Sequence, residues 1–229
     1  VARFPFDKFS DASNKLGTQM KATGEVMSIG RTMEESLLKA VRSLETGVCH
    51  LYHKKFDSWS NDALLDYIKE GTDDRVYAIT QLIRNGVDLA LIYNNTKIDM
   101  FFLEKFKNII EFESVVRANP TDVETLRAAK RMGFSDKYIG QLWGLSQHDM
   151  YLLREKHGIF PVYKMIDTCA SEFSSYVPYF YSTYEEENES IVSRKEKIIV
   201  LGSGPIRIGQ GVEFDYSTVH AIWSIRAAG

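Results

Sequence analysis

The run from Lys197 to Tyr216 constrains the fold of this chain more than any other feature. It begins as an apolar strand, continues as a glycine-rich turn and ends at the start of a helix. A parallel strand of this kind buries both faces, so it needs neighbouring strands and a layer of helices on each side. Because the sequence stops at Gly229, we expect this α/β unit to be incomplete and the chain to be a piece of a larger protein.

The composition is that of a globular protein. The chain has 229 residues, of which 44% are hydrophobic and 12% aromatic, which is enough for one sizeable core or two smaller ones. The net charge of −3 provides no broad positive field, so nucleic acid is not expected as the main partner. The sequence shows neither a charged-then-apolar leader pattern nor an apolar run long enough to span a bilayer, so no membrane partner is expected.

The cysteines and histidines suggest neither a disulfide nor a metal site. Cys49 and Cys169 lie far apart in the sequence, which fits a reducing cytoplasm and small buried thiols. His50 and His53 could share one helical face, but no third ligand is evident. We therefore predict no metal and a cytoplasmic location.

The middle of the chain carries repeated helix start and stop signals. Thr32 and Glu35 form a capping box before a helix that buries Leu37, Leu38, Val41 and Leu44 and ends near Gly47. From Ser60 to about Gly158 further helices are expected, one of them long, with Phe102, Phe106, Ile109, Ile110 and Val116 on its inner face. Their predicted starts are Ser60, Asp73 or Asp74, Asn95 or Thr96, Thr121, Ser135 and Ser146; glycines follow their ends, at Gly71, Gly86, Gly133, Gly144 and Gly158.

The helical period disappears between Phe160 and Glu189, where tyrosines are frequent. We interpret this segment as an extended connector held to a neighbour by its aromatic rings. The acidic run from Glu185 to Glu187, continuing through Ser190 to Glu196, is then expected to be a solvated linker into the final strand.

The glycine-rich turn contains Gly202, Gly204, Gly209 and Gly211, which would let the backbone approach a ligand closely. Its spacing is neither that of the dinucleotide fingerprint nor that of a P-loop. Arg207 could hold an anion, and Glu213 could orient Arg207 or a water molecule. The alternative for the glycine-rich turn is a merely tight strand–helix connection. The alternative for the charged residues Arg207, Glu213 and Asp215 is a solvated position on the surface.

The helices between Thr121 and Gly158 also resemble a helix-turn-helix DNA-binding motif. Acidic and basic residues nearly balance in this region, whereas such motifs surround the reading helix with basic phosphate contacts. Structural packing is therefore the preferred interpretation. A helical module that binds DNA or another macromolecule remains the alternative.

Four ordered runs carry a resemblance to a known family. They are Thr18 to Thr32 (TQMKATGEVMSIGRT), Pro161 to Phe173 (PVYKMIDTCASEF), Tyr181 to Glu187 (YSTYEEE) and Leu201 to Tyr216 (LGSGPIRIGQGVEFDY). In these runs, which are distributed from near one end of the chain to the other, the sequence resembles the central part of the large subunit of carbamoyl phosphate synthetase. The stretch from Val48 to Asn61 is longer and more aromatic than the family pattern.

The resemblance implies a mainly α fold in three parts. Residues 1–45 would be the truncated end of the first, ATP-grasp, synthetase half. Residues 46–189 would be a helical oligomerisation domain of short helices with its connector. Residues 190–229 would be the truncated β–α start of the pre-ATP-grasp domain of the second half.

The resemblance also implies a function. The intact enzyme is an ATP-dependent carbon–nitrogen ligase that uses two ATP, with Mg (or Mn), to make carbamoyl phosphate from bicarbonate and glutamine-derived ammonia. The ammonia comes from a small glutaminase subunit, and the product enters pyrimidine or arginine biosynthesis. For the present residues the resemblance implies self-association into a homo-oligomer, no catalytic residue, no bound cofactor and no activity in isolation.

The family's carbamate tunnel supplies the candidate site residues. The resemblance places Glu25 on the side of the first half, and Arg207, Gly211 and Glu213 at the entrance to the second half. Gly211 would keep the passage open, Arg207 would guide an anion, and the two glutamates would order water. These residues are expected to line a conduit and to take no part in catalysis.

Overall fold

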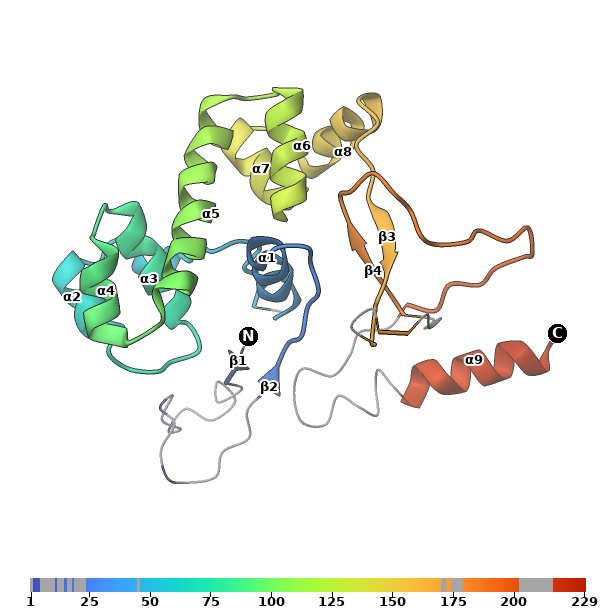
Figure 1. Ribbon diagram of the computed structural model, residues 1–229, viewed down its shortest axis with the longest axis horizontal. Helices are drawn as coiled ribbons and strands as arrows, with labels where there is room; N and C mark the ends of the chain where they lie inside the picture. Colours follow the sequence, from blue (N-terminus) through green and yellow to red (C-terminus); the bar gives the residue numbers. More distant parts are fainter. Residues whose placement is uncertain are drawn as a thin grey trace. The chain divides into compact units, whose positions relative to one another are not determined.

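The computed structural model describes residues 2–4, 11, 15, 18, 24–44, 46–169, 172–173, 179–201 and 216–229. Helices predominate among them, which confirms the predicted mainly α fold (Figure 1). The elements are β1 (Ala2–Arg3), β2 (Gly24–Glu25), α1 (Met33–Ser43), the 3-10 helix η2 (Lys54–Phe56), α2 (Asn61–Tyr67), α3 (Arg75–Arg84), α4 (Leu89–Thr96), α5 (Met100–Ala118), α6 (Val123–Met132), α7 (Asp136–Trp143), α8 (Gln147–Lys156), β3 (Val162–Met165), β4 (Phe180–Thr183) and α9 (Ser217–Ala227).

The chain divides into two compact units. The larger, helical unit comprises Ser28–Glu70 and Asp74–Ile191 and holds α1 to α8 with β3 and β4. The smaller unit comprises Val1–Met27, Gly71–Asp73 and Val192–Gly229. The domain bounds expected from the sequence, 1–45, 46–189 and 190–229, stay a prediction.

Helix α1 begins at the predicted cap. Thr32 Oγ1 accepts a hydrogen bond from the N–H of Glu35 at 3.1 Å, which satisfies one of the unpaired donors of the first turn. The Glu35 carboxylate accepts from the N–H of Arg31 at 2.7 Å, one residue before the cap, so the reciprocal half of the predicted capping box is not formed. The helix ends at Ser43, before Gly47.

The prediction that a long helix starts at Asn95 or Thr96 is wrong. Those two residues lie in a separate helix, α4, which Asp88 caps and which ends where Lys97 adopts a left-handed conformation with φ of 56°. The long helix α5 starts only after Asp99, whose side chain accepts from the N–H of Phe101. The sequence reading missed α4 because this short helix buries only Ile92, too little for a visible period.

Four other helix starts agree with the predictions or lie within one residue of them. Ser60 caps α2, Ser135 caps α7, and Ser146 caps α8 in a full capping box with Asp149. Helix α6 is capped by Asp122 and not by Thr121, because the carboxylate of Asp122 accepts from the N–H of Thr125 at 2.8 Å.

Helix α5 is the central element of the helical unit. It contacts α1, α3, α4, α6 and α7, and Figure 1 shows it running between the α2–α4 group and the α6–α8 group. Its buried face contains Leu103, Phe106, Ile109 and Val116. Phe102, predicted to be on this face, is 40% exposed. Its neighbour Leu103 occupies the buried position on the core-facing side of the helix.

The stretch from Val48 to Ser60 forms a loop with one 3-10 turn, and Asn61 begins α2. Phe56 is fully buried and packs edge-on against Trp59, with ring centroids 5.3 Å apart. His50 and His53 share no helical face, contrary to the sequence prediction. His50 is in the loop, and the Nδ1 of His53 accepts from the N–H of Lys55 to cap η2.

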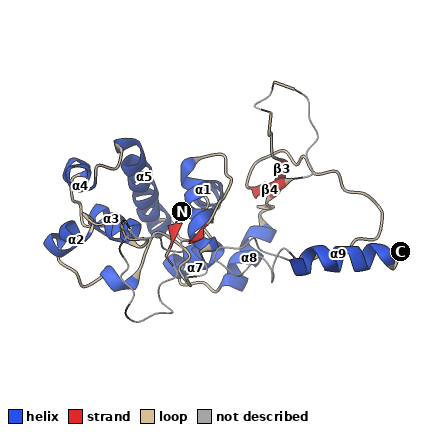
Figure 2. Cartoon of the chain, turned by 90° about the horizontal axis from the view of Figure 1, so that it is seen from below, coloured by secondary structure: helices blue, strands red, loops and turns tan. Residues whose placement is uncertain are grey.

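The tyrosine-rich segment forms an antiparallel hairpin and not merely an extended connector (Figure 2). Strands β3 and β4 pair with Val162 opposite Thr183 and Met165 opposite Phe180. The chain then returns along β3, where Glu189 Oε2 accepts from the N–H of Met165 at 2.7 Å. Pairing satisfies backbone groups that a single extended strand would leave to solvent.

In the smaller unit, β1 and β2 pair in an antiparallel manner, and the N–H of Phe4 donates to Asp73 at 2.8 Å. The strand predicted just before the glycine-rich turn is not formed over residues 197–201. Ile199 and Leu201 are 82% and 91% exposed. A strand needs a partner strand for its backbone groups, and this segment pairs with none of the described residues.

Candidate functional site

The structure describes only one of the four predicted tunnel residues. Glu25 is exposed and lies in β2, where it pairs with Ala2. Arg207, Gly211 and Glu213 lie outside the described residues, as do Gly202, Gly204, Gly209 and Asp215. The conduit role of these four residues therefore stays a prediction.

A buried ionic cluster joins α6, α7 and α8. Asp136 Oδ1 lies 2.8 Å from the Nζ of Lys130, and its Oδ2 lies 2.8 Å from an Nη2 nitrogen of Arg154. Lys130 also donates to the carbonyl of Phe134, and Arg154 donates to the carbonyl of Ile159. One carboxylate thus holds two cations, and these cations bind the turn before α7 and the turn after α8.

Burial sets the protonation behaviour of this cluster. Loss of solvent lowers the pKa of the Lys130 ammonium to about 8, although the Asp136 carboxylate opposes that change. Burial also works against ionisation of Asp136, but Lys130 and Arg154 outweigh it and lower the pKa of the Asp136 carboxyl. Removing Asp136 would therefore leave two cations with no carboxylate between them.

The β3–β4 hairpin packs against the same cluster. The ring of Tyr184 lies 4.9 Å from the Nζ of Lys130 and 5.8 Å from the guanidinium carbon of Arg154. Lys39 of α1 donates to the carbonyl of Ser182 at 2.5 Å. The hairpin is thus attached to the helices through cations of α1, α6 and α8.

A second buried cluster surrounds His50. The His50 ring stacks on Tyr138 with centroids 3.8 Å apart, and its Nε2 lies 3.7 Å from a Glu113 carboxylate oxygen. That same oxygen, Oε2, accepts from Arg84 at 2.7 Å. Burial, followed by the positive charges of Arg84 and Arg42, holds the pKa of His50 well below its usual value. His50 is therefore neutral at neutral pH and contributes to packing.

Helices α4 and α5 expose four large apolar side chains to solvent. They are Leu91, Tyr93, Phe101 and Phe102, whose exposed fractions run from 39% to 50%. The Phe101 and Phe102 rings meet edge-on at 5.3 Å. We call these four residues the α4–α5 surface. Large apolar side chains exposed on a folded protein can mark a contact with another protein.

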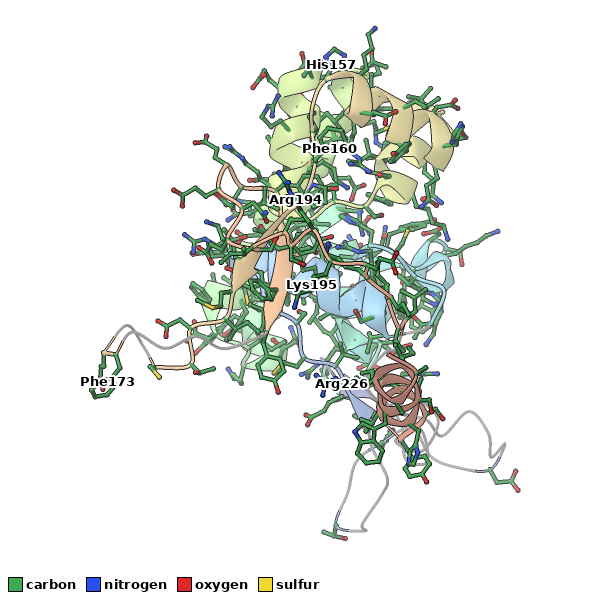
Figure 3. All side chains as sticks on the ribbon, turned by 90° about the vertical axis from the view of Figure 1, so that its right-hand side faces the viewer. His157, Phe160, Phe173, Arg194, Lys195 and Arg226 are labelled. Carbon is green, nitrogen blue, oxygen red and sulfur yellow. The ribbon has the colours of Figure 1, made fainter. Side chains whose placement is uncertain are left out.

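Other exposed aromatics lie near the hairpin. Figure 3 shows Phe160, which follows α8, and Phe173, on the loop between β3 and β4; they are 49% and 73% exposed.

In the described part of the chain, no cluster of three potential metal ligands is found. None of the described helices has the length and apolarity needed to cross a membrane.

Comparison with family models identifies the chain. Residues 25–158, more than half of the sequence, match the model described as carbamoyl-phosphate synthetase large chain, oligomerisation domain. The chain belongs to the carbamoyl-phosphate synthetase large-chain family. Residues 194–229 match a second model, described as carbamoyl phosphate synthase preATP-grasp domain. The resemblance drawn from the sequence motifs is confirmed, and the large chain places this protein in a ligase family.

Within this large-chain segment, sequence reasoning missed both buried clusters. Asp136 and Arg154 are eighteen residues apart, and His50 and Glu113 are further apart still, so no local spacing marks either pair. The only available signal was indirect. An acidic residue directly after the Ser135 cap of a helix is common, and it does not show which cations will pack against it.

Proposed function

We propose that this chain is part of a carbamoyl phosphate synthetase large subunit and that its helical unit links the two synthetase halves and mediates self-association. The intact enzyme would make carbamoyl phosphate from bicarbonate, glutamine-derived ammonia and two ATP with Mg or Mn, for pyrimidine or arginine biosynthesis. The observation that carries the proposal is the oligomerisation-domain match over residues 25–158, which covers α1 to α8.

The helical unit suits a linking and docking role. Its core is continuous from α1 through α8, because Leu38, Leu64, Ile109 and Met150 belong to one buried cluster. Such a core holds its outer surfaces in fixed positions. The α4–α5 surface is the apolar area that we assign to contact with a second copy of the chain. A specific contact of this kind buries on the order of 1,600 Å² in total.

The tunnel assignment is part of this proposal. Glu25 would order water on the side of the first half, while Arg207, Gly211 and Glu213 would line the passage into the second half. The support is the family membership together with the presence of these residues in the motif runs quoted above.

The small glutaminase subunit would be the partner that supplies ammonia. The two cysteines, both free thiols, fit the proposed cytoplasmic location.

The DNA-binding alternative has less support. Among the basic residues of α6 and α8, Lys130 and Arg154 are buried and bound to Asp136. Neither is available to a phosphate backbone on the outside of the helices, whereas helix-turn-helix proteins present such cations to DNA. Retention of duplex DNA at low salt would favour the alternative.

Two measurements test the proposal on the purified chain. Incubation with ATP, magnesium, bicarbonate and ammonia is expected to give no carbamoyl phosphate, and robust product would overturn the assignment of a purely structural role. Sedimentation over a concentration series is expected to show a monomer that converts to a larger species. A monomer at every concentration would contradict the self-association role.

A further inference from the structure

A cavity of about 630 Å³ opens beside the buried ionic cluster of the helical unit. Its walls come from α1, the loop after α1, the α6–α7 turn, the first turn of α8 and the end of β4. All of these elements belong to one compact unit. The volume is within the usual range for sites that bind small molecules. Glu25, the one tunnel residue that the structure describes, does not line this cavity.

The charge along the cavity is positive, although the whole chain is negative. Four cations line it, Lys39, Arg42, Lys130 and Lys137, against two carboxylates, Glu35 and Asp136. Glu35 is occupied by Lys39 at 2.7 Å. Asp136 is already shared between Lys130 and the adjacent Arg154. The carboxylates therefore leave a surplus of positive charge.

Two of these cations have no carboxylate partner among the described residues. The Nη1 of Arg42 donates to the carbonyl of Gly133 at 2.6 Å, and no described carboxylate forms an ion pair with this guanidinium. Burial lowers the pKa of the Arg42 guanidinium. The nearby Cys49, Tyr184 and Glu35 raise this pKa by less than burial lowers it. Lys137, exposed at the first turn of α7, also lacks a described ion-pair partner. An anion in the cavity would offset both charges.

Neutral donors and apolar walls complete the site. Ser135 and Gln147 line the cavity at the starts of α7 and α8, where the helix dipoles also favour negative charge. Val48, Pro161 and the ring of Tyr184 form a less polar wall. A ligand with a compact dianionic group and a small organic body would match both parts, and the planar fork of arginine suits a phosphate group.

We propose that this cavity binds a small organic phosphate monoester, with the phosphate between Arg42 and Lys137 and the organic body against Val48, Pro161 and Tyr184. The ligand would join α1, the α6–α7 turn and the hairpin through one anion. It would therefore stabilise the helical unit by binding the folded state. The lining of this site shares no residue with the α4–α5 surface.

The test is a calorimetric titration of the whole chain with phenyl phosphate, inorganic phosphate and acetate. We expect saturable binding in the order phenyl phosphate, inorganic phosphate, acetate, because the ring adds apolar contact and acetate carries one charge. Lys137→Gln and Arg42→Gln should each weaken phenyl phosphate binding by about tenfold, the effect of losing one charged hydrogen bond. Lys156→Gln removes the same charge from an exposed position on α8 that does not line the cavity, and it should change affinity by less than about twofold.

Lys137 makes no described hydrogen bond, so its variant tests the site even if Arg42→Gln unfolds the protein. No saturable binding of any probe would overturn the proposal. Equal weakening by Lys137→Gln and Lys156→Gln would overturn it as well, because that result indicates a general charge effect. Phenyl phosphate that binds no more tightly than inorganic phosphate would rule out the apolar wall as part of the site.

Discussion

Asp136 Oδ1 lies 2.8 Å from the Nζ of Lys130, which is buried at the C-terminal end of α6. The lysine keeps its charge in this interior only because the carboxylate and the Phe134 carbonyl surround its ammonium group. A buried ion pair of this kind stabilises the fold no more than well-packed apolar residues of similar size would. Removing one partner is nevertheless strongly destabilising, because the other charge stays buried without a counter-ion.

Asp136→Asn is therefore expected to lower the free energy of unfolding by about 3 kcal/mol, since Lys130 and Arg154 lose their shared counter-ion. Urea denaturation followed by the helical circular dichroism signal measures this loss. The matched control is Asp66→Asn, because Asp66 pairs with Lys69 on the surface with 81% of its side chain exposed. If both substitutions had the same small effect, the buried cluster would not stabilise the fold.

The stability of the helical unit should fall at mildly acidic pH because of His50. The pKa of His50 is depressed in the folded state, so below its unfolded value of 6.5 the unfolded chain binds a proton that the folded chain does not. The stability from neutral His50 is complete above pH 6.5 and is lost as pH falls, at up to about 1.4 kcal/mol per pH unit.

His50→Phe provides the comparison, because a phenyl ring can stack on Tyr138 and Phe134 without titrating. Urea midpoints between pH 7 and pH 5 should fall more steeply for the wild type than for this variant. Parallel slopes would show that His50 does not contribute to the pH dependence.

Two glycines that end helices should differ in their tolerance of alanine. Gly133 and Gly144 both adopt left-handed conformations, with φ of 96° and 70°. A Cβ at Gly133 would lie 2.9 Å from the Cα of Glu35, whereas nothing lies within 4 Å of a Cβ at Gly144. Gly144→Ala carries the conformational cost alone, about 1 kcal/mol.

Gly133→Ala adds a backbone clash with α1 and disturbs the carbonyl that Arg42 binds, so its cost should be about 3 kcal/mol. Thermal or urea unfolding of the two variants measures the difference. Equal costs would mean that α1 and the α6–α7 turn are less closely packed than the structure indicates.

Local signals explain which parts of the fold were predictable. Ser135, Ser146, Gly133 and Gly144 were predicted as helix ends because capping depends on a few adjacent residues. The hairpin was seen only as extended chain, because the pairing of Val162 with Thr183 depends on residues far apart in sequence.

Side-chain exposure and ionic partners were less predictable. Phe102 fits the helical period of α5 about as well as Leu103, and the position of the neighbouring helices determines which one is buried. The pairing of Asp136 with both Lys130 and Arg154 arises only when three helices pack. Of the tunnel residues, only Glu25 belongs to the described structure, so that assignment rests on the family motifs.

The central claim is that the helical unit self-associates through the α4–α5 surface. Phe101→Asp places a charge on that surface, where Phe101 is 50% exposed and its loss creates no cavity in the core. Leu152→Asp is the matched control, because Leu152 is a similarly exposed apolar residue on α8, at 45%. Both variants should remain folded by circular dichroism.

Sedimentation velocity of the wild type and both variants, from about 1 to 100 μM, measures the dissociation constant of the assembly most directly. The account predicts that Phe101→Asp raises this constant at least about tenfold while Leu152→Asp leaves it within about twofold. A wild-type chain that stays monomeric, or an assembly that withstands Phe101→Asp and dissociates with Leu152→Asp, would contradict the account.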